Sequence, residues 1–165
     1  MKKFLFIMMA IFAFGLQNAR AQDAPLKIIT NHPDFDVKVK RCAASGKSVI
    51  IDMVFTNKSD KDVMIDVIAN ANGYWTVVYD DEGNKYEGIK GAITTKVANS
   101  GSYAGKVTDY RLISGIPVKV SFCINNVSTT AENIAYFEGV VFCKEWGIPA
   151  KDKWLIIRNI PITRN

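Results

Sequence analysis

The chain alternates apolar and polar residues with a period of two over most of its length after residue 36. Successive side chains of a strand point to opposite faces, so this period predicts strands with one buried face and one wet face. In the clearest run, residues 118–124, apolar residues take every second position and Lys119, Ser121 and Cys123 fall between them. The predicted strands cover residues 37–42, 48–56, 63–67, 75–79, 86–89, 118–124, 134–143 and 154–162.

Turn-forming residues separate these runs. Ala44-Ser45-Gly46 predicts a hairpin between the first two strands, and the stretch 80–84 predicts a second hairpin because Gly83 and Asn84 accept positive φ at low cost. Residues 91–115 are rich in glycine and serine and predict a mobile connection with short strands.

The fold predicted from this pattern is all-β: an immunoglobulin-like antiparallel β-sandwich of about nine strands in two sheets. No internal repeat or linker divides the chain, so residues 22–165 are predicted to form a single domain. Each sheet should bury its apolar face, which places Phe55, Trp75 and Phe122 at the centre of the core.

The first 21 residues have the pattern of a cleaved signal peptide. Lys2 and Lys3 precede an apolar run over residues 4–16, and Ala19-Arg20-Ala21 supplies small residues at a cleavage site. The run is shorter than the ~20 apolar residues of a permanent membrane span. We therefore expect export to the periplasm or the extracellular space, with no stable membrane insertion of the mature chain.

Cleavage of this segment would lower the formal net charge of the chain, and the charge of the mature chain is the one that its partners meet. The chain has 21 basic and 16 acidic residues, and cleavage takes away Lys2, Lys3 and Arg20 but no acid. Eighteen basic residues then face 16 acids, which is a formal charge of +2 instead of +5. Such a small surplus, without basic clusters along the sequence, argues against a nucleic-acid partner.

Three segments carry a family resemblance, and they occur in the family's order: VIIDMVFTNKSD at 49–60, VYDDEGNKY at 78–86 and SGIPVKVSF at 114–122. With the strands around them, over about residues 37–162, they resemble small secreted bacterial immunoglobulin-like domains of unknown function. The resemblance implies an immunoglobulin-like sandwich and brings no established catalytic residues. The Cys…Trp…Cys pattern of antibody domains is not matched.

Candidate catalytic and metal-binding residues are few. His32, the single histidine, lies in a polar segment with a proline and is interpreted as a surface residue, not as a member of a hydrolytic triad. One histidine and three scattered cysteines do not have the spacing of a zinc site, and no cofactor motif is present.

The cysteines Cys42, Cys123 and Cys143 leave at least one thiol unpaired in a monomer, and the sequence leaves open whether any disulfide forms. If a hairpin joined the strands of Cys123 and Cys143, Cys123 would face residues 135–137, so these two would not be bridged.

Binding is predicted on loops at one end of the sandwich. The tentative surface consists of Asp80, Asp81, Glu82 and Asn84 in the acidic turn, with Trp146 in the loop 144–153. Calcium at the acidic turn is one alternative, although the turn lacks the spacing of an EF-hand loop. Exposed aromatic side chains that stack on sugars are another.

The predicted function is that of an exported non-enzymatic domain that binds an unknown protein or a glycan in the cell envelope. Two alternatives stay open: a glycan-binding or envelope hydrolase accessory protein, and an inhibitor or assembly subunit that pairs through an exposed strand edge.

Overall fold

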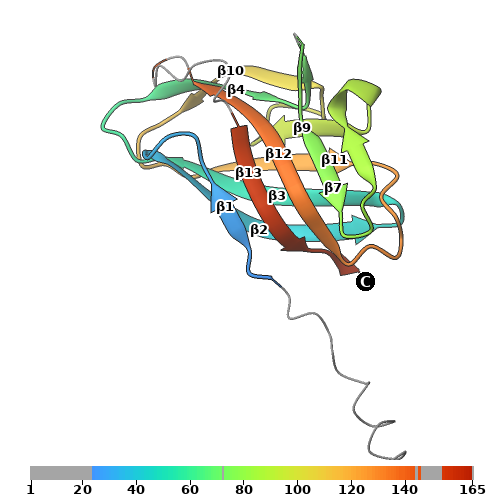
Figure 1. Ribbon diagram of the computed structural model, residues 1–165. Coiled ribbons are helices and arrows are strands. Elements are labelled where there is room, and N and C mark those ends of the chain that lie inside the picture. The colour runs from blue at the N-terminus through green and yellow to red at the C-terminus, as the bar shows by residue number, and fades with distance from the viewer. Residues whose placement is uncertain (1–23, 72, 144, 146–153, 165) are drawn as a thin grey trace, which may run out of the picture.

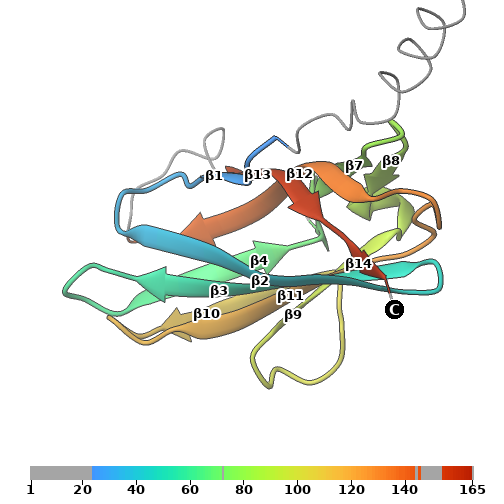
Figure 2. The same cartoon turned by 90° about the horizontal axis from the view of Figure 1, so that it is seen from below.

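The computed structural model describes residues 24–71, 73–143, 145 and 154–164. Two antiparallel sheets pack face to face, and Figures 1 and 2 show β12 and β13 of one sheet lying across β2 and β3 of the other. The first sheet consists of β1 (Lys27–Ile29), β4 (Val63–Ile68), β7 (Val77–Asp80), β8 (Lys85–Glu87), β10 (Lys106–Leu112), β12 (Asn133–Cys143) and β13 (Trp154–Pro161). The second sheet consists of β2 (Phe35–Ser45), β3 (Ser48–Asn57), β9 (Ile93–Val97), β11 (Val118–Ile124) and β14 (Thr163–Arg164).

The seven-stranded sheet is organised around β12. One side of β12 pairs with β13, which in turn pairs with β1. Its other side is shared by β7, which pairs with residues 134–138, and β4, which pairs with residues 140–143. β8 extends the sheet beyond β7, and β10 extends it beyond β4.

The five-stranded sheet has the order β14-β2-β3-β11-β9. Its strands are antiparallel except for the two-residue contact of β14 with β2, which is parallel. A separate ribbon of β5 (Asn70–Ala71) and β6 (Tyr74–Trp75) and the 3-10 turn η1 (Gly88–Lys90) complete the described elements.

The core lies between the two sheets and contains the apolar positions that the alternation predicted. Val118, Val120, Phe122 and Ile124 of β11 are all buried. The Phe122 ring meets the ring of Phe137 from the opposite sheet edge-to-face, with centroids 4.9 Å apart. This contact joins the two layers at the centre of the sandwich.

The all-β class and the two-sheet sandwich are confirmed, but details of the prediction are wrong. Trp75 is only half-buried because it pairs with Asn70 in the outlying ribbon. Residues 91–115 do contain short strands, as predicted, but β9 and β10 belong to different sheets, so this stretch is part of both layers and more than a connection. Short strands in this stretch and the ribbon raise the strand count above nine.

The hairpin considered for Cys123 and Cys143 does not form, because β11 and β12 belong to opposite sheets. All three cysteines are thiols and not disulfide partners. Cys42 and Cys143 are buried, and burial raises the pKa of the Cys42 thiol to about 12 despite the charge of Arg164.

The predicted signal peptide, Trp146 and most of its loop lie outside the described residues. In the part of the chain that is described, no helix has the length and apolar character needed to cross a membrane.

The Phe122→Ala variant should lose about 3–5 kcal/mol of unfolding free energy, because a large cavity replaces a fully buried ring. Urea unfolding followed by tryptophan fluorescence measures this loss. Cys123→Ser, one residue along on the outward face, serves as the control and should change stability by less than about 0.5 kcal/mol. A loss below about 1 kcal/mol for Phe122→Ala would contradict its place in the core.

Candidate functional site

The acidic turn between β7 and β8 is built around the carboxylate of Asp80, which is only 2% exposed. One of its oxygens accepts hydrogen bonds from the backbone N–H groups of Glu82 (3.1 Å) and Asn84 (2.8 Å). The other accepts from the Asn84 side-chain amide (2.9 Å) and from the Tyr86 hydroxyl (2.7 Å). Asp80 therefore forms the turn and does not present its carboxylate to a ligand.

These donors determine the ionisation of Asp80. Burial alone would raise the pKa of the Asp80 carboxyl, but the hydrogen bonds from Asn84, Tyr86 and the Glu82 amide outweigh it and lower the pKa. The Tyr86 hydroxyl also accepts a hydrogen bond from the Ser128 N–H (3.2 Å). Tyr86 thus connects the acidic turn to the loop that precedes β12.

The neighbouring acids point to other partners. Asp81 accepts hydrogen bonds from the backbone N–H groups of Glu132 (3.1 Å) and Asn133 (3.0 Å) at the start of β12. Glu82 accepts one from the Thr130 hydroxyl. Asp80 and Glu82 both accept from the Asn84 side-chain amide, whereas Asp81 is held at the start of β12, so protein donors engage all three carboxylates. The described residues contain no group of three or more histidine, cysteine, aspartate or glutamate side chains that could hold a metal ion.

Arg164 holds the same loop from its other side. Its guanidinium donates to the backbone carbonyls of Ser128 (2.7 Å) and Ala131 (2.8 Å). The loop 128–132 is therefore fixed between the acidic turn and β14, although it contains no regular element.

A cavity of about 320 Å³ opens beside this fixed loop, within the size range of small-ligand sites. Its walls are mostly small or apolar, and three polar side chains, Asp81, Asn133 and Asn159, join them. The described lining residues are Ala24, Pro25, Leu26, Asp81, Asn133, Ala135, Asn159 and Pro161. A second, more open cavity of about 460 Å³ adjoins it, shares Asn133 and Pro161, and extends to Glu132 and Arg164.

Irregular backbone in two adjacent strands lines the first cavity. The register between β12 and β7 shifts between Ile134 and Tyr136, so Ala135 is a bulge residue. Across from it in β13, Asn159 has φ +58°, a left-handed conformation that asparagine tolerates better than most residues. The Asn159 side-chain amide donates to the Pro25 carbonyl (3.2 Å), which holds the N-terminal segment over the sheet.

A row of cations and aromatic rings crosses the outer face of the sheet next to this cavity. In register order it consists of Lys27, Arg158, Tyr136, Tyr79 and Lys85. The Arg158 guanidinium lies 4.8 Å from the Tyr136 ring centroid, and the Lys85 ammonium lies 5.9 Å from that of Tyr79. Cations already occupy one face of each ring, so the row is a cross-strand stabilising ladder more than a free stacking platform.

The Tyr136 hydroxyl is fixed by a hydrogen bond as well. It donates to the Glu138 carboxylate, and burial together with this hydrogen bond raises the pKa of Tyr136 to about 12. The hydroxyl therefore stays protonated at physiological pH and does not serve as a base.

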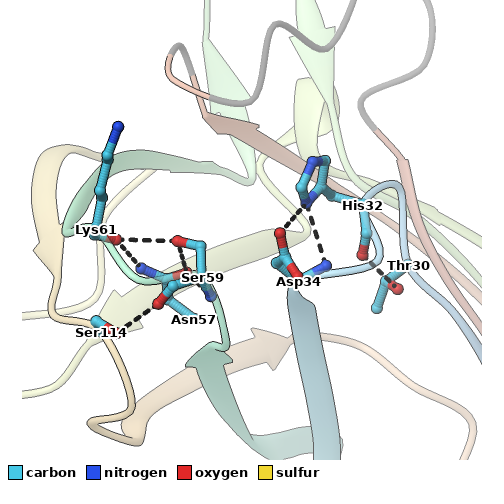
Figure 3. A network of polar contacts seen from close by, with 7 residues as sticks. All are labelled: Thr30, His32, Asp34, Asn57, Ser59, Lys61 and Ser114. Atoms are coloured by element: carbon cyan, nitrogen blue, oxygen red, sulfur yellow. Dashed lines mark hydrogen bonds and ion pairs between the residues drawn. The ribbon is translucent and has the colours of Figure 1, made fainter.

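His32 lies in the turn that precedes β2 and is half-buried. Its Nδ1 accepts the Asp34 backbone N–H (3.2 Å), whereas in a hydrolytic triad Nδ1–H donates to a carboxylate. Figure 3 shows the contacts of His32 with Asp34 as one group and those among Asn57, Ser59, Lys61 and Ser114 as another. Both groups fasten turns: Asn57, for example, donates to the Lys61 carbonyl (2.7 Å) and accepts from the Ser59 N–H (3.0 Å).

The structure separates the residues of the tentative binding surface. Asp80 is buried, Asp81 lines the first cavity, and Glu82 and Asn84 are exposed on the turn. Trp146 lies outside the described residues. Sequence reasoning missed Asn133, Ala135 and Asn159, because single polar or small residues within strand patterns give no signal for a bulge or a positive φ.

Comparison with known proteins adds little to this geometry. No family model matches the chain, and no curated protein matches it. A structural search finds a family 123 glycoside hydrolase from Clostridium perfringens, with a TM-score of 0.39 and 9% sequence identity. The match covers 86% of this chain but only 27% of that enzyme's chain. A likeness of this degree assigns neither a family nor an activity.

The Asp80→Asn variant should flatten the acid dependence of stability. The folded pKa of Asp80 is lowered, so its contribution is fully present above the unfolded pKa of about 3.9 and disappears as the pH falls through the folded pKa. At pH 7 the variant should lose about 1–3 kcal/mol of unfolding free energy, because the hydrogen-bond donors around residue 80 no longer meet a carboxylate. Between about pH 5 and pH 2 its unfolding free energy should fall less than that of the parent. Urea unfolding across this pH range measures both effects.

The exposed residue Asp60 provides a matched control. Asp60→Asn should change the unfolding free energy at pH 7 by less than about 0.5 kcal/mol, because the residue lies on the surface. Parallel profiles for the parent and for Asp80→Asn would contradict the role assigned to Asp80.

The Asn159→Val variant should be destabilised by about 1–2 kcal/mol, because a β-branched side chain opposes φ +58°. Asn159→Gly adopts this φ without strain and should therefore be more stable than the valine variant, although both lose the bond to Pro25. Thermal unfolding of the two variants measures the difference. Equal midpoints would show that the left-handed backbone is not a constraint at this position.

Proposed function

We propose that the protein is an exported, non-catalytic binding domain, and that the cavity between the N-terminal segment and β12–β13 receives hydroxyl groups of a glycan. The observation that carries this proposal is the meeting of Asp81, Asn133 and Asn159 in a cavity of about 320 Å³ with otherwise small and apolar walls. Binding sites for small ligands commonly combine apolar walls with a few fixed polar groups.

The polar groups suit sugar hydroxyls, which both donate and accept hydrogen bonds. A carboxylate oxygen has two lone pairs, so Asp81 can accept from a ligand while the N–H groups at the start of β12 hold it in place. Carboxamides such as those of Asn133 and Asn159 supply both a donor and an acceptor. Ala135, Pro25 and Pro161 offer apolar surface for the C–H face of a sugar ring.

The lining supports binding over hydrolysis. A glycosidase needs two carboxyl groups that flank the scissile bond. Among the described residues, one carboxylate, that of Asp81, lines the first cavity, and it already accepts backbone hydrogen bonds. Glu132 belongs to the adjoining cavity and donates its backbone N–H to Asp81. The hydrolase alternative therefore has less support from the geometry.

The test is titration of the protein by calorimetry with maltohexaose, cellohexaose, xylohexaose and chitohexaose. The Ala135→Leu variant places a larger side chain in the cavity, so it should weaken binding of any oligosaccharide that the parent binds by about tenfold or more. Ala43→Leu serves as the matched control, since Ala43 is a half-buried alanine facing outward on the other sheet. Its affinity should equal that of the parent.

Two results would contradict the proposal. If Ala135→Leu binds as tightly as Ala43→Leu, the ligand does not occupy this cavity. If reducing ends accumulate during incubation with the bound oligosaccharide, the domain is a hydrolase and not a binding module.

A further inference from the structure

The outer face of the five-stranded sheet gathers basic side chains from three strands. Lys38 of β2 and Lys119 of β11 both flank Val54, so they share one cross-strand row. Arg41 of β2 and Lys96 of β9 stand at the two ends of the next row. Neighbouring strands are about 4.8 Å apart, so the backbone positions at the ends of these rows are separated by roughly 10–14 Å.

One carboxylate organises the centre of this face. Asp52, whose side chain is 9% exposed, accepts hydrogen bonds from the Arg41 guanidinium (2.9 Å) and from the Ser121 hydroxyl (2.6 Å). Arg41 contacts Oδ2, and the Lys119 ammonium lies 3.2 Å from Oδ1, the oxygen that Ser121 also contacts. Burial alone would raise the pKa of Asp52, but these hydrogen bonds and the two positive charges lower it, so the carboxylate stays ionised.

Asp52 fixes the positions of cations that remain accessible. The side chains of Arg41 and Lys119 are 58% and 60% exposed, whereas the carboxylate beneath them is nearly covered. An approaching anion therefore meets the cations before the carboxylate. Cations held in place before binding lose less conformational entropy when a ligand arrives.

The face also retains a positive charge after its own acids are counted. The one other outward carboxylate on it, that of Asp36, is 3.1 Å from Lys58 and 4.0 Å from Lys38. Cations thus outnumber carboxylates across the described face, with Lys38, Arg41, Lys58, Lys96 and Lys119 against Asp36 and Asp52. This surplus is larger than the sequence suggested, because strand pairing unites basic residues from distant parts of the chain.

Several features that other classes of ligand require are missing from the described part of this face. The outward positions of this sheet, all described, include no aromatic residue on which bases of a single-stranded nucleic acid would stack. The sheet also presents no helix or projecting ribbon for a duplex groove. Five of the exposed large apolar side chains that could insert into a membrane lie outside these strands: Leu26, Ile29, Ile89, Ile113 and Ile116. Tyr103 flanks β9, because its neighbour Ala104 bridges to Thr95, so the described face has one ring at its margin and no apolar patch.

We propose that this outer face, with Lys38, Arg41, Lys96 and Lys119, is a second binding site that takes an acidic polysaccharide. Carboxylates along an extended glycan chain match cations in successive rows of a flat sheet. The free N–H groups of Arg41 suit carboxylate recognition. The half-buried Thr94 and Thr56 hydroxyls on the same face supply hydrogen bonds for neutral groups of the chain.

The test uses fluorescein-labelled polygalacturonate and measures its anisotropy as protein is added. Binding by the unmodified protein should weaken about tenfold or more when the salt concentration rises from about 50 mM to about 200 mM, because the contacts are electrostatic. Neutral dextran should not compete. Double-stranded DNA and vesicles with acidic phospholipid are titrated in parallel and should bind more weakly than polygalacturonate.

The variant Lys38→Gln/Lys96→Gln removes two cations that are not bonded to Asp52, and it should bind polygalacturonate about tenfold more weakly than the parent. Lys106→Gln/Arg111→Gln is the matched control: it removes the same charge from exposed positions of β10 in the other sheet and should bind within about twofold of the parent. Thermal unfolding confirms that both variants are folded. If the first one is not, Lys38→Gln alone replaces it.

Several outcomes would overturn this proposal. These are no binding of polygalacturonate at about 50 mM salt, equal weakening in the two double variants, or tighter binding of DNA or vesicles. The site is separate from the cavity at Asp81, so Ala135→Leu should leave polygalacturonate binding unchanged. Failure of one proposal therefore does not decide the other.

Discussion

The rest of the structure depends on one constraint: both sheets must bury their apolar faces in one shared core. The edge-to-face contact between Phe122 and Phe137 lies within this core. Each ring comes from a different sheet, and each is fully buried. Strands with a two-residue period must give one face to this shared core, since burial of apolar surface is the main stabilising term in folding. The opposite face of every strand is then free to carry other chemistry.

The two outer faces use this freedom differently. On the seven-stranded sheet, the bulge at Ala135 and the left-handed Asn159 line a cavity without disturbing the core. Their chain neighbours Ile134 and Ile160 remain buried. On the five-stranded sheet, regular pairing brings Arg41, Asp52 and Ser121 into one row. Irregular backbone thus gives a concave site, and regular backbone gives a flat charged face.

Periodicity was sufficient to predict the class of fold and the burial of Phe55 and Phe122, because these depend on one strand at a time. Pairing between strands was not predictable, so the sequence did not show that the strands of Cys123 and Cys143 lie in opposite sheets. The same limit applies to the candidate sites. The acidic turn was located correctly, but the sequence did not show that Asp80 would turn inward. Nor did it show that Lys38, Lys96 and Lys119 would share a face.

Two edge stretches of the sandwich carry features that oppose strand addition: the part of β2 that β14 does not cover, and β10. β2 has a bulge between Val39 and Arg41 and a run of basic residues along its length. β10 has a bulge between Val107 and Tyr110, where Asp109 takes φ +53°. Bulges and charges are the means by which natural sheets prevent edge-to-edge pairing. An assembly subunit that recruits its partner through a strand would need a flatter and less charged edge than either of these two.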